Sequence, residues 1–183
     1  MARTRQTSTS ASKTHTARWA VAGAAAAVLA ADQATKCLAA AGRIPSSPSA
    51  SWISVGLGGN HGATGSVGSG SVLLVAAAAL ALTALAAALA LRTTNRTAAL
   101  SLAAVIGGAL GNLADRFLRS PGLGSGGVVD WIHINLGAGR GFTLNLADLA
   151  ILLGLLAATA ALAIARTNAA HTTKPATAAL AAS

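Results

Sequence analysis

Four long apolar stretches constrain the fold of this chain more than any other feature. They run over roughly 19–41, 72–91, 97–118 and 144–165. A helix needs about 20 residues to cross the hydrocarbon core of a membrane, and each stretch is long enough or nearly so. Hydrophobic residues make up 54% of the chain, charged residues only 9%, and the mean hydropathy is +0.62, which excludes an ordinary soluble domain. The sequence predicts an all-α membrane protein with four transmembrane helices.

The basic residues predict how these helices are oriented. They cluster before the first stretch, between the second and third, and after the fourth, at Arg3, Arg5, Lys13, Arg18, Arg92, Arg96, Arg166 and Lys174. Segments rich in Lys and Arg stay cytoplasmic, so both termini are predicted to be cytoplasmic and the connections 42–71 and 119–143 extracytoplasmic. We expect the first of these two connections to contain a small β element. The chain then divides into a basic tail (1–18), a four-span domain (19–166) and a second cytoplasmic tail (167–183).

Composition also limits the possible partners and modifications. The net charge is +9, but the basic residues are spread along the chain and are not interleaved with the five aromatic residues, so no nucleic-acid partner is predicted. Cys37 is the only cysteine, which excludes an intramolecular disulfide and any paired-cysteine metal or redox motif. The apolar run after the basic start also fits a cleaved signal peptide, but further apolar helix follows Lys36, so a membrane span is preferred.

The acidic residues mark the candidate active site. All four are aspartates, Asp32, Asp115, Asp130 and Asp148, and the chain has no glutamate. Ionisable groups are costly in a bilayer, and those found in apolar segments usually face the protein interior or a wet cavity. The first and third stretches run outward and the fourth begins outside, so all four aspartates are expected near the outer membrane boundary. We predict that the functional site lies on that face.

The polar residues on this face form four clusters in a fixed order. They are Asp32-Gln33-Ala34-Thr35-Lys36, Asn60-His61-Gly62-Ala63-Thr64-Gly65-Ser66, the run from Gly107 to Arg116, and Val128-Val129-Asp130-Trp131-Ile132 with the run from Phe142 to Asp148. In this order, on four spans, the clusters resemble the lipoprotein signal peptidase (signal peptidase II) family from Asp32 to Leu153. The resemblance implies a monomeric aspartic endopeptidase of the bacterial cytoplasmic membrane, without cofactor or metal. It implies cleavage of diacylglyceryl-modified prolipoproteins, held at the membrane lipid, on the N-terminal side of the lipidated cysteine.

Asp130 and Asp148 match the catalytic pair of that family. Two neighbouring carboxylates can divide peptide hydrolysis, one activating water as a base and the other donating a proton as an acid. Close carboxylates share a proton, because both cannot ionise cheaply. Asp148 is expected in the first turn of the last helix, capped by Thr143 or Asn145, where the helix dipole favours an anion. We therefore expect Asp148 to be the ionised partner.

Other residues are expected to support this pair. By resemblance, Asn60 and Gly62 belong to an outer loop that touches the substrate peptide, although Asn60 also fits a simple turn. Asn145 is expected to position the pair or to cap the helix.

The third stretch contributes Asn112 and Asp115, which are spaced i,i+3 and share a helix face. Asp115 is expected to pair with the adjacent Arg116, either to fix the helix or to present Arg116 to the substrate. Gly107, Gly108 and Gly111 offer small surfaces for close helix packing.

Asp32 and Lys36 are spaced i,i+4 and are expected to form a local ion pair that supports the site, with Lys36 able to extend to the membrane interface.

Two rival interpretations compete with this assignment. Aspartates among membrane helices also serve as relays in a small ion- or proton-coupled transporter. Asp130 and His133 are spaced i,i+3, which with His61 suggests zinc, but no recognisable three-ligand spacing is present. The chain also departs from the family pattern at Trp131, where phenylalanine is common, and in the glycine-rich segment 136–141.

Overall fold

The computed structural model describes residues 5–45, 52–57, 72–119, 127–138 and 140–180, with side chains described from residue 18 to residue 170 except at 72 and 73 and in the gaps. It contains four helices and three strands within these ranges. They are α1 (Arg5–Ala40), β1 (Ile53–Val55), α2 (Val72–Arg92), α3 (Arg96–Leu118), β2 (Ile132–Gly137), β3 (Arg140–Leu144) and α4 (Leu146–Leu180).

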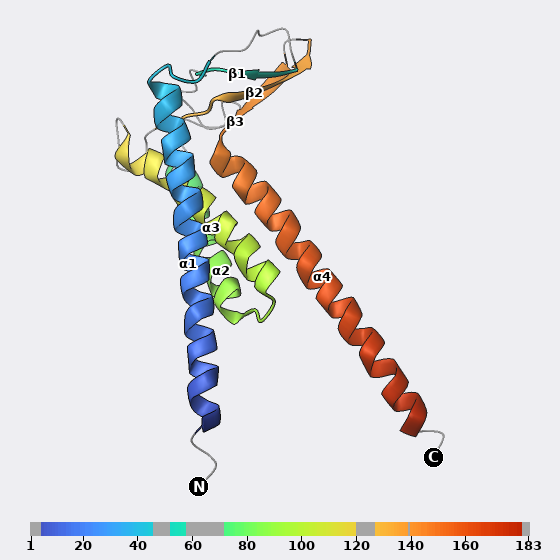
Figure 1. Ribbon diagram of the computed structural model, residues 1–183. Helices are drawn as coiled ribbons and strands as arrows, with labels where there is room; N and C mark the ends of the chain where they lie inside the picture. The colour runs from blue at the N-terminus through green and yellow to red at the C-terminus, as the bar shows by residue number, and fades with distance from the viewer. Residues whose placement is uncertain (1–4, 46–51, 58–71, 120–126, 139, 181–183) are drawn as a thin grey trace.

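Helix α3 is the centre of the molecule and packs against α1, α2 and α4 (Figure 1). The small sheet lies at one end of the bundle, where α1 ends and α4 begins, and the remote ends of α1 and α4 lie at the other end. Helix α3 is capped at Asn95, whose side chain accepts a hydrogen bond from the backbone N–H of Ala98 at 3.0 Å. Asn95 marks the end of α3 away from the sheet. At the sheet end, α3 lies beside the end of α1 and the start of α4.

Glycine in α3 allows this close packing. A Cβ at Gly107 would clash with the carbonyl oxygen of Ala25 in α1, and one at Gly108 would lie 2.6 Å from the carbonyl oxygen of Ala147 in α4. Side chains at these two positions would push the helices apart, so the predicted role of these glycines in helix packing is confirmed.

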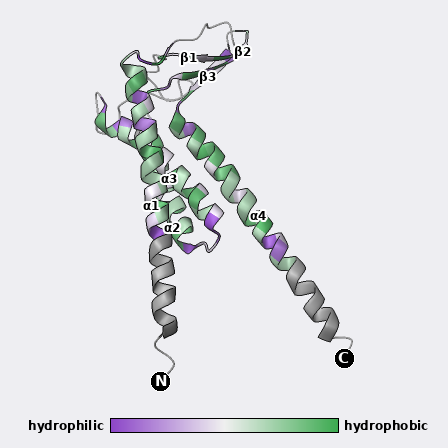
Figure 2. Ribbon diagram, in the orientation of Figure 1, coloured by the Kyte–Doolittle hydropathy of each residue, from purple (hydrophilic) through white to green (hydrophobic). Residues whose placement is uncertain are grey.

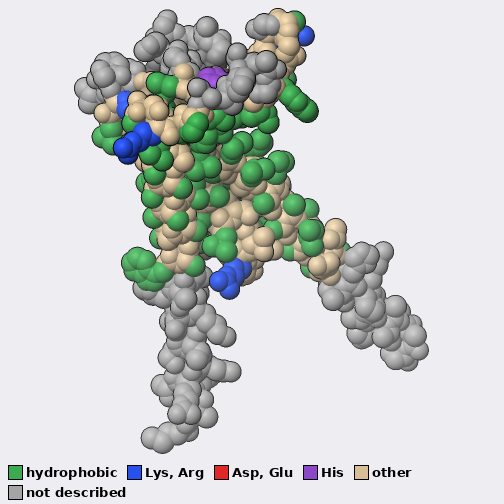
Figure 3. Space-filling model, turned by 45° about the horizontal axis from the view of Figure 1, so that its top comes forward, with side chains coloured by type: hydrophobic (Ala, Val, Ile, Leu, Met, Phe, Trp, Pro, Cys, Tyr) green, Lys and Arg blue, Asp and Glu red, His purple; other side chains and the backbone are tan. Residues whose placement is uncertain are grey.

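The described part of the chain has three helices that could cross a membrane by length and composition. They are α2 from Leu74, α3, and α4 as far as Ala170 (Figure 2). The polar residues Asp32, Gln33 and Lys36 interrupt the apolar part of α1, so a fourth span stays a prediction. Figure 3 shows apolar side chains covering the visible face of the helices, with Lys and Arg side chains near the two ends.

Helices α1 and α4 are longer than the stretches predicted from the sequence. Helix α1 begins at Arg5 and α4 ends at Leu180, so both run into segments that the sequence analysis assigned to tails. The division of the chain into 1–18, 19–166 and 167–183 stays a prediction.

The sheet is antiparallel in the order β1-β2-β3. The small β element expected in the first connection is β1, whereas the hairpin of β2 and β3 in the second connection was not predicted. Its turn uses left-handed backbone at Gly137 (φ 79°) and at Ala138 (φ 52°). The hairpin carries the chain from Asp130 back to the start of α4, so it sets the distance between the two predicted catalytic residues.

We predict that Gly154→Ala lowers the thermal stability of the protein in detergent. A Cβ at Gly154 of α4 would lie 2.7 Å from the carbonyl oxygen of Ser101 in α3, and overpacking of this kind costs about 1–3 kcal/mol. The control is Gly23→Ala in α1, where a Cβ meets nothing within 4 Å. Alanine is the better helix former by about 1 kcal/mol, so the control should be neutral or stabilising. Equal effects of the two substitutions would contradict the packing described here.

Candidate active site

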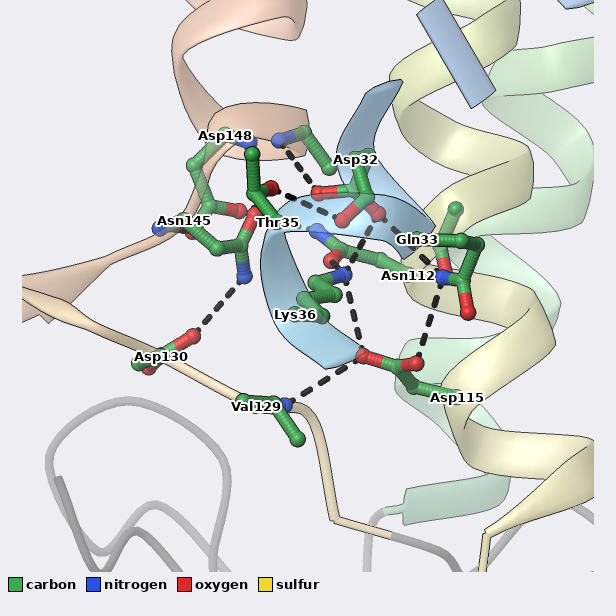
Figure 4. A network of polar contacts seen from close by, with 12 residues as sticks. Asp32, Gln33, Thr35, Lys36, Asn112, Asp115, Val129, Asp130, Asn145 and Asp148 are labelled. Carbon is green, nitrogen blue, oxygen red and sulfur yellow. Dashed lines mark hydrogen bonds and ion pairs between the residues drawn. The ribbon is translucent and has the colours of Figure 1, made fainter. Parts of the chain in front are cut away.

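The predicted site residues meet at the sheet end of the bundle. Figure 4 shows Asp32 and Lys36 from α1, Asn112 and Asp115 from α3, and Asp148 from α4 converging with the segment that carries Asp130. The connections between these residues are direct hydrogen bonds and ion pairs.

The first turn of α4 fixes Asp148. The side-chain oxygen of Asn145 accepts a hydrogen bond from the backbone N–H of Asp148 (3.0 Å), and Asp148 Oδ2 accepts one from the backbone N–H of Asn145 (3.1 Å). This reciprocal arrangement is a capping box, and it confirms Asn145 as the residue that caps α4. The neighbouring N–H of Ala147 donates to Asp32 Oδ1 at 2.9 Å. Asp32 thus satisfies a second free N–H of the first turn from another helix.

Asn145 also connects Asp148 to Asp130. Its Nδ2 atom donates to Asp130 Oδ1 at 2.8 Å, while its own backbone N–H binds Asp148. The hydroxyl of Thr143 donates to Asp130 Oδ2 at 2.8 Å. Asp130 is only 5% exposed, whereas Asp148 is half-buried. One asparagine therefore holds both carboxylates, and Asp148 is the more accessible of the two.

Lys36 is completely buried behind these acids. Its ammonium lies 2.8 Å from Asp32 Oδ2, 2.9 Å from Asp115 Oδ2 and 2.9 Å from Asn112 Oδ1. An ammonium has three donors, and all three are used. The predicted Asp32–Lys36 pair is confirmed, but the expectation that Lys36 extends to the membrane interface is wrong. Acceptors on α1 and α3 satisfy all the hydrogen-bond donors of the ammonium inside the protein, so none of them requires water.

Lys36 also determines the orientation of the Asn112 amide. The ammonium can only donate, so it binds the amide oxygen and leaves the amide nitrogen facing the other way. That nitrogen donates to Asp148 Oδ1 at 2.8 Å. Asn112 is 8% exposed, and its amide is held from both sides. The charge on Lys36 is thereby linked to Asp148 through one oriented side chain.

Asp115 has different partners from those predicted. Its Oδ1 accepts from Arg119 Nε at 2.8 Å, whereas the adjacent Arg116 donates to the backbone oxygen of Asn112 at 3.0 Å. Burial lowers the pKa of Arg119, but the hydrogen bond to Asp115 and the charge of Asp115, with contributions from Cys37, together outweigh burial and keep that pKa above its ordinary value. Sequence analysis missed Arg119, although it stands i,i+4 to Asp115, the same spacing that identified Asp32 and Lys36.

Asp115 and Gln33 tie the site to its surroundings. Asp115 Oδ2 accepts from the backbone N–H of Val129 at 3.2 Å, which fixes the residue before Asp130. Gln33, for which no role was predicted, donates to Asp115 Oδ1 at 3.2 Å and to the carbonyl oxygen of Gly111 at 3.1 Å. The segment carrying Asp130 is thus anchored to α3, and α3 to α1.

Some predicted residues are not placed by the structure. Asn60, Gly62 and His61 lie outside the described residues. His133 contacts the carbonyl oxygen of Gly56 through Nε2 at 2.8 Å, an interaction that joins β2 to the end of β1. Among the described residues, no three His, Cys, Asp or Glu side chains are grouped so that they could hold a metal ion.

The fold and the site together define a class of protein: a helical membrane protein with two carboxylates bridged by one asparagine at one end of its bundle. Comparison with known proteins identifies the family. The model of the family described as signal peptidase (SPase) II matches residues 24–164. The chain belongs to this family and is a bacterial membrane hydrolase that acts as a peptidase.

Individual relatives agree with this assignment. The lipoprotein signal peptidase of Rhodococcus jostii is 37% identical over 153 residues, which cover 78% of this chain and 72% of the relative. That of Leifsonia xyli is 35% identical over 96 residues, covering 52% of this chain and 43% of the relative. A bacterial membrane enzyme solved by the in meso method at 2.3 Å resolution has the same fold, with a TM-score of 0.64, 23% identity, and coverage of 81% of this chain and 90% of that one.

We predict that Lys36→Met strongly destabilises the protein. The substitution leaves the carboxylates of Asp32 and Asp115 buried without their shared cation, and breaking a buried ion pair in this way costs about 3–5 kcal/mol. The measurement is thermal unfolding in detergent. Arg43→Met is the control, because Arg43 is exposed just beyond the end of α1. A stability equal to that of the control would show that the buried network is not required for folding.

Proposed function

We propose that this chain is an aspartic endopeptidase that removes the signal peptide from diacylglyceryl-modified prolipoproteins, cutting on the N-terminal side of the lipidated cysteine. Family membership supports the reaction and the prolipoprotein substrate. The observation that carries the catalytic assignment is the contact of Asn145 with both Asp130 and Asp148. The comparisons give no support to the alternative of an ion- or proton-coupled transporter.

The two carboxylates have different surroundings, which suggests different roles. Asp148 accepts hydrogen bonds from the Asn112 amide and from a backbone N–H at the positive end of a helix, and both offset part of the cost of burying its negative charge. Asp130 accepts a hydrogen bond from the Asn145 amide at Oδ1, but its other oxygen contacts the hydroxyl of Thr143, which can accept a hydrogen bond as well as donate one. The same contact therefore serves a protonated Asp130. We assign Asp148 as the base and Asp130 as the acid.

Hydrolysis then follows from these two roles. A water molecule loses a proton to Asp148 as its oxygen attacks the scissile carbonyl carbon. Asp130 supplies a proton to the leaving nitrogen as the carbon–nitrogen bond breaks, and the products are a carboxylic acid and an amine. Asn112 and Asn145 keep the carboxylates in place during both transfers, so the barrier includes little reorganisation of the site.

The site lies where a lipid-anchored substrate would present its scissile bond. We infer that the protein sits in the bacterial cytoplasmic membrane as a monomer, with both termini cytoplasmic and the sheet end at the outer face. The basic residues at the end of the bundle away from the sheet, Arg18, Arg92, Arg96 and Arg166, support this orientation (Figure 1). Membrane lipid would hold the acyl chains of the substrate and raise its effective concentration at the two aspartates.

We predict that Asp130→Asn and Asp148→Asn each reduce cleavage of a diacylglyceryl-modified prolipoprotein by at least about a hundredfold. Each substitution keeps the shape of the side chain but removes one partner of the proton transfer, and such transfers contribute about 10²–10⁴ in rate. Cleavage is measured by gel shift with purified protein in detergent, after thermal unfolding confirms that the variants are folded. Arg92→Gln, at the far end of α2, is the control and should retain activity. An active double variant would rule out the dyad.

We predict opposite labelling of two introduced cysteines in intact cells. In a Cys37→Ala background, Arg43→Cys lies beyond the sheet end of α1 and should react with a membrane-impermeant maleimide. Thr94→Cys, exposed between α2 and α3, should react only after the membrane is permeabilised. The reverse pattern would place the active site on the cytoplasmic side.

A further inference from the structure

The indole nitrogen of Trp131 is buried and has no hydrogen-bond partner among the residues that the structure describes. An indole N–H can only donate, so water or another acceptor must satisfy it. Native proteins seldom leave a buried donor unsatisfied, and each exception calls for an explanation. Trp131 directly follows Asp130, so its backbone belongs to the immediate surroundings of the candidate active site.

The backbone of Trp131 is fixed on both sides. Its N–H donates to the carbonyl oxygen of Leu144, and its carbonyl oxygen accepts from the N–H of Gly56, both at 3.0 Å. Leu144 is the last residue of β3 and is followed by Asn145, while Gly56 follows the last residue of β1. Trp131 thus lies between the capping residue that holds both aspartates and the segment that leads toward Asn60 and Gly62.

The register of the sheet places the ring on the polar face. His133 is the partner of Thr143, and Ser54 is the partner of His133, so these three side chains share one face. Trp131 immediately precedes β2, and its backbone hydrogen bonds to Leu144 and Gly56 continue the pairing of the strands, so the alternation of side chains puts Trp131 on the same face as His133. Thr143 on this face is the residue that donates to Asp130. The ring of Trp131 is half-buried, and its nitrogen is the enclosed part.

We propose that the indole N–H of Trp131 donates a hydrogen bond to a carbonyl oxygen of the bound substrate. This inference rests on the proposed function, because it requires a lipidated peptide to lie against Asp130. Such a substrate carries carbonyl oxygens in its backbone beside the scissile bond and in the esters of its diacylglyceryl group. Trp131 does not take part in proton transfer, so it contributes to substrate binding and to the alignment of the peptide.

The test compares Trp131→Phe with wild type. Phenylalanine keeps an aromatic ring and removes the donor, so KM for a diacylglyceryl-modified prolipoprotein should rise about five- to tenfold, with kcat within about twofold of wild type. The dissociation constant of the same substrate, measured in the Asp148→Asn background, should rise by the same factor. Trp52→Phe is the matched control, because Trp52 begins the approach to β1 and is 82% exposed.

A second substrate identifies the acceptor. A dialkylglyceryl-modified peptide has ether linkages and lacks the ester carbonyls. If Trp131→Phe weakens binding of this substrate too, the acceptor is a peptide carbonyl; if the effect disappears, the acceptor is an ester carbonyl. Unchanged KM and dissociation constant with both substrates, including the case in which Trp131→Phe alters only thermal stability, would overturn the inference. Failure of the wild type to cleave either substrate would instead refute the proposed function.

Discussion

The rest of the site depends on the contacts of the Lys36 ammonium. It binds Asp32 on its own helix and Asn112 and Asp115 on α3, and all three connections extend further. Asp32 caps α4, and Asp115 holds the segment that leads to Asp130. A buried ion cluster of this kind adds little net stability, because desolvation of its charges offsets their attraction. The charges are paired only when α1, α3 and the start of α4 are in register, so the cluster favours this arrangement of the three helices.

The start of α4 fixes the position of Asp148, one of the two aspartates assigned to catalysis. The first turn of a helix has backbone N–H groups without partners in the helix, and here they are bound by Asp32, Asn145 and Asp148. Asp148 thereby acquires a fixed position and a favourable field for a negative charge. The side-chain amide of Asn145 donates a hydrogen bond to Asp130. The same few hydrogen bonds therefore stabilise the end of the helix and fix the geometry of the candidate active site.

Comparison of the predicted and observed contacts shows where sequence reasoning is reliable. The i,i+4 pair of Asp32 and Lys36 was predicted, because residues at that spacing lie on one helix face. The predicted pairing of Asp115 with Arg116 was wrong, because it did not follow this spacing rule. Adjacent residues point about 100° apart around a helix, whereas Arg119, one turn later, points in the same direction as Asp115.

The sequence by itself determined the class of protein, the polar clusters and their order, and the two aspartates assigned to catalysis. Apolar stretches of membrane length and rare acids in apolar surroundings carry this information locally. Only the tertiary structure decided that Lys36 is buried rather than extended to the interface, and that Asn145 touches both aspartates. It also decided that a hairpin leads from Asp130 to α4, and that the indole nitrogen of Trp131 is buried without a partner among the described residues. These features depend on contacts between segments far apart in the chain, where spacing along the sequence no longer fixes distance in space.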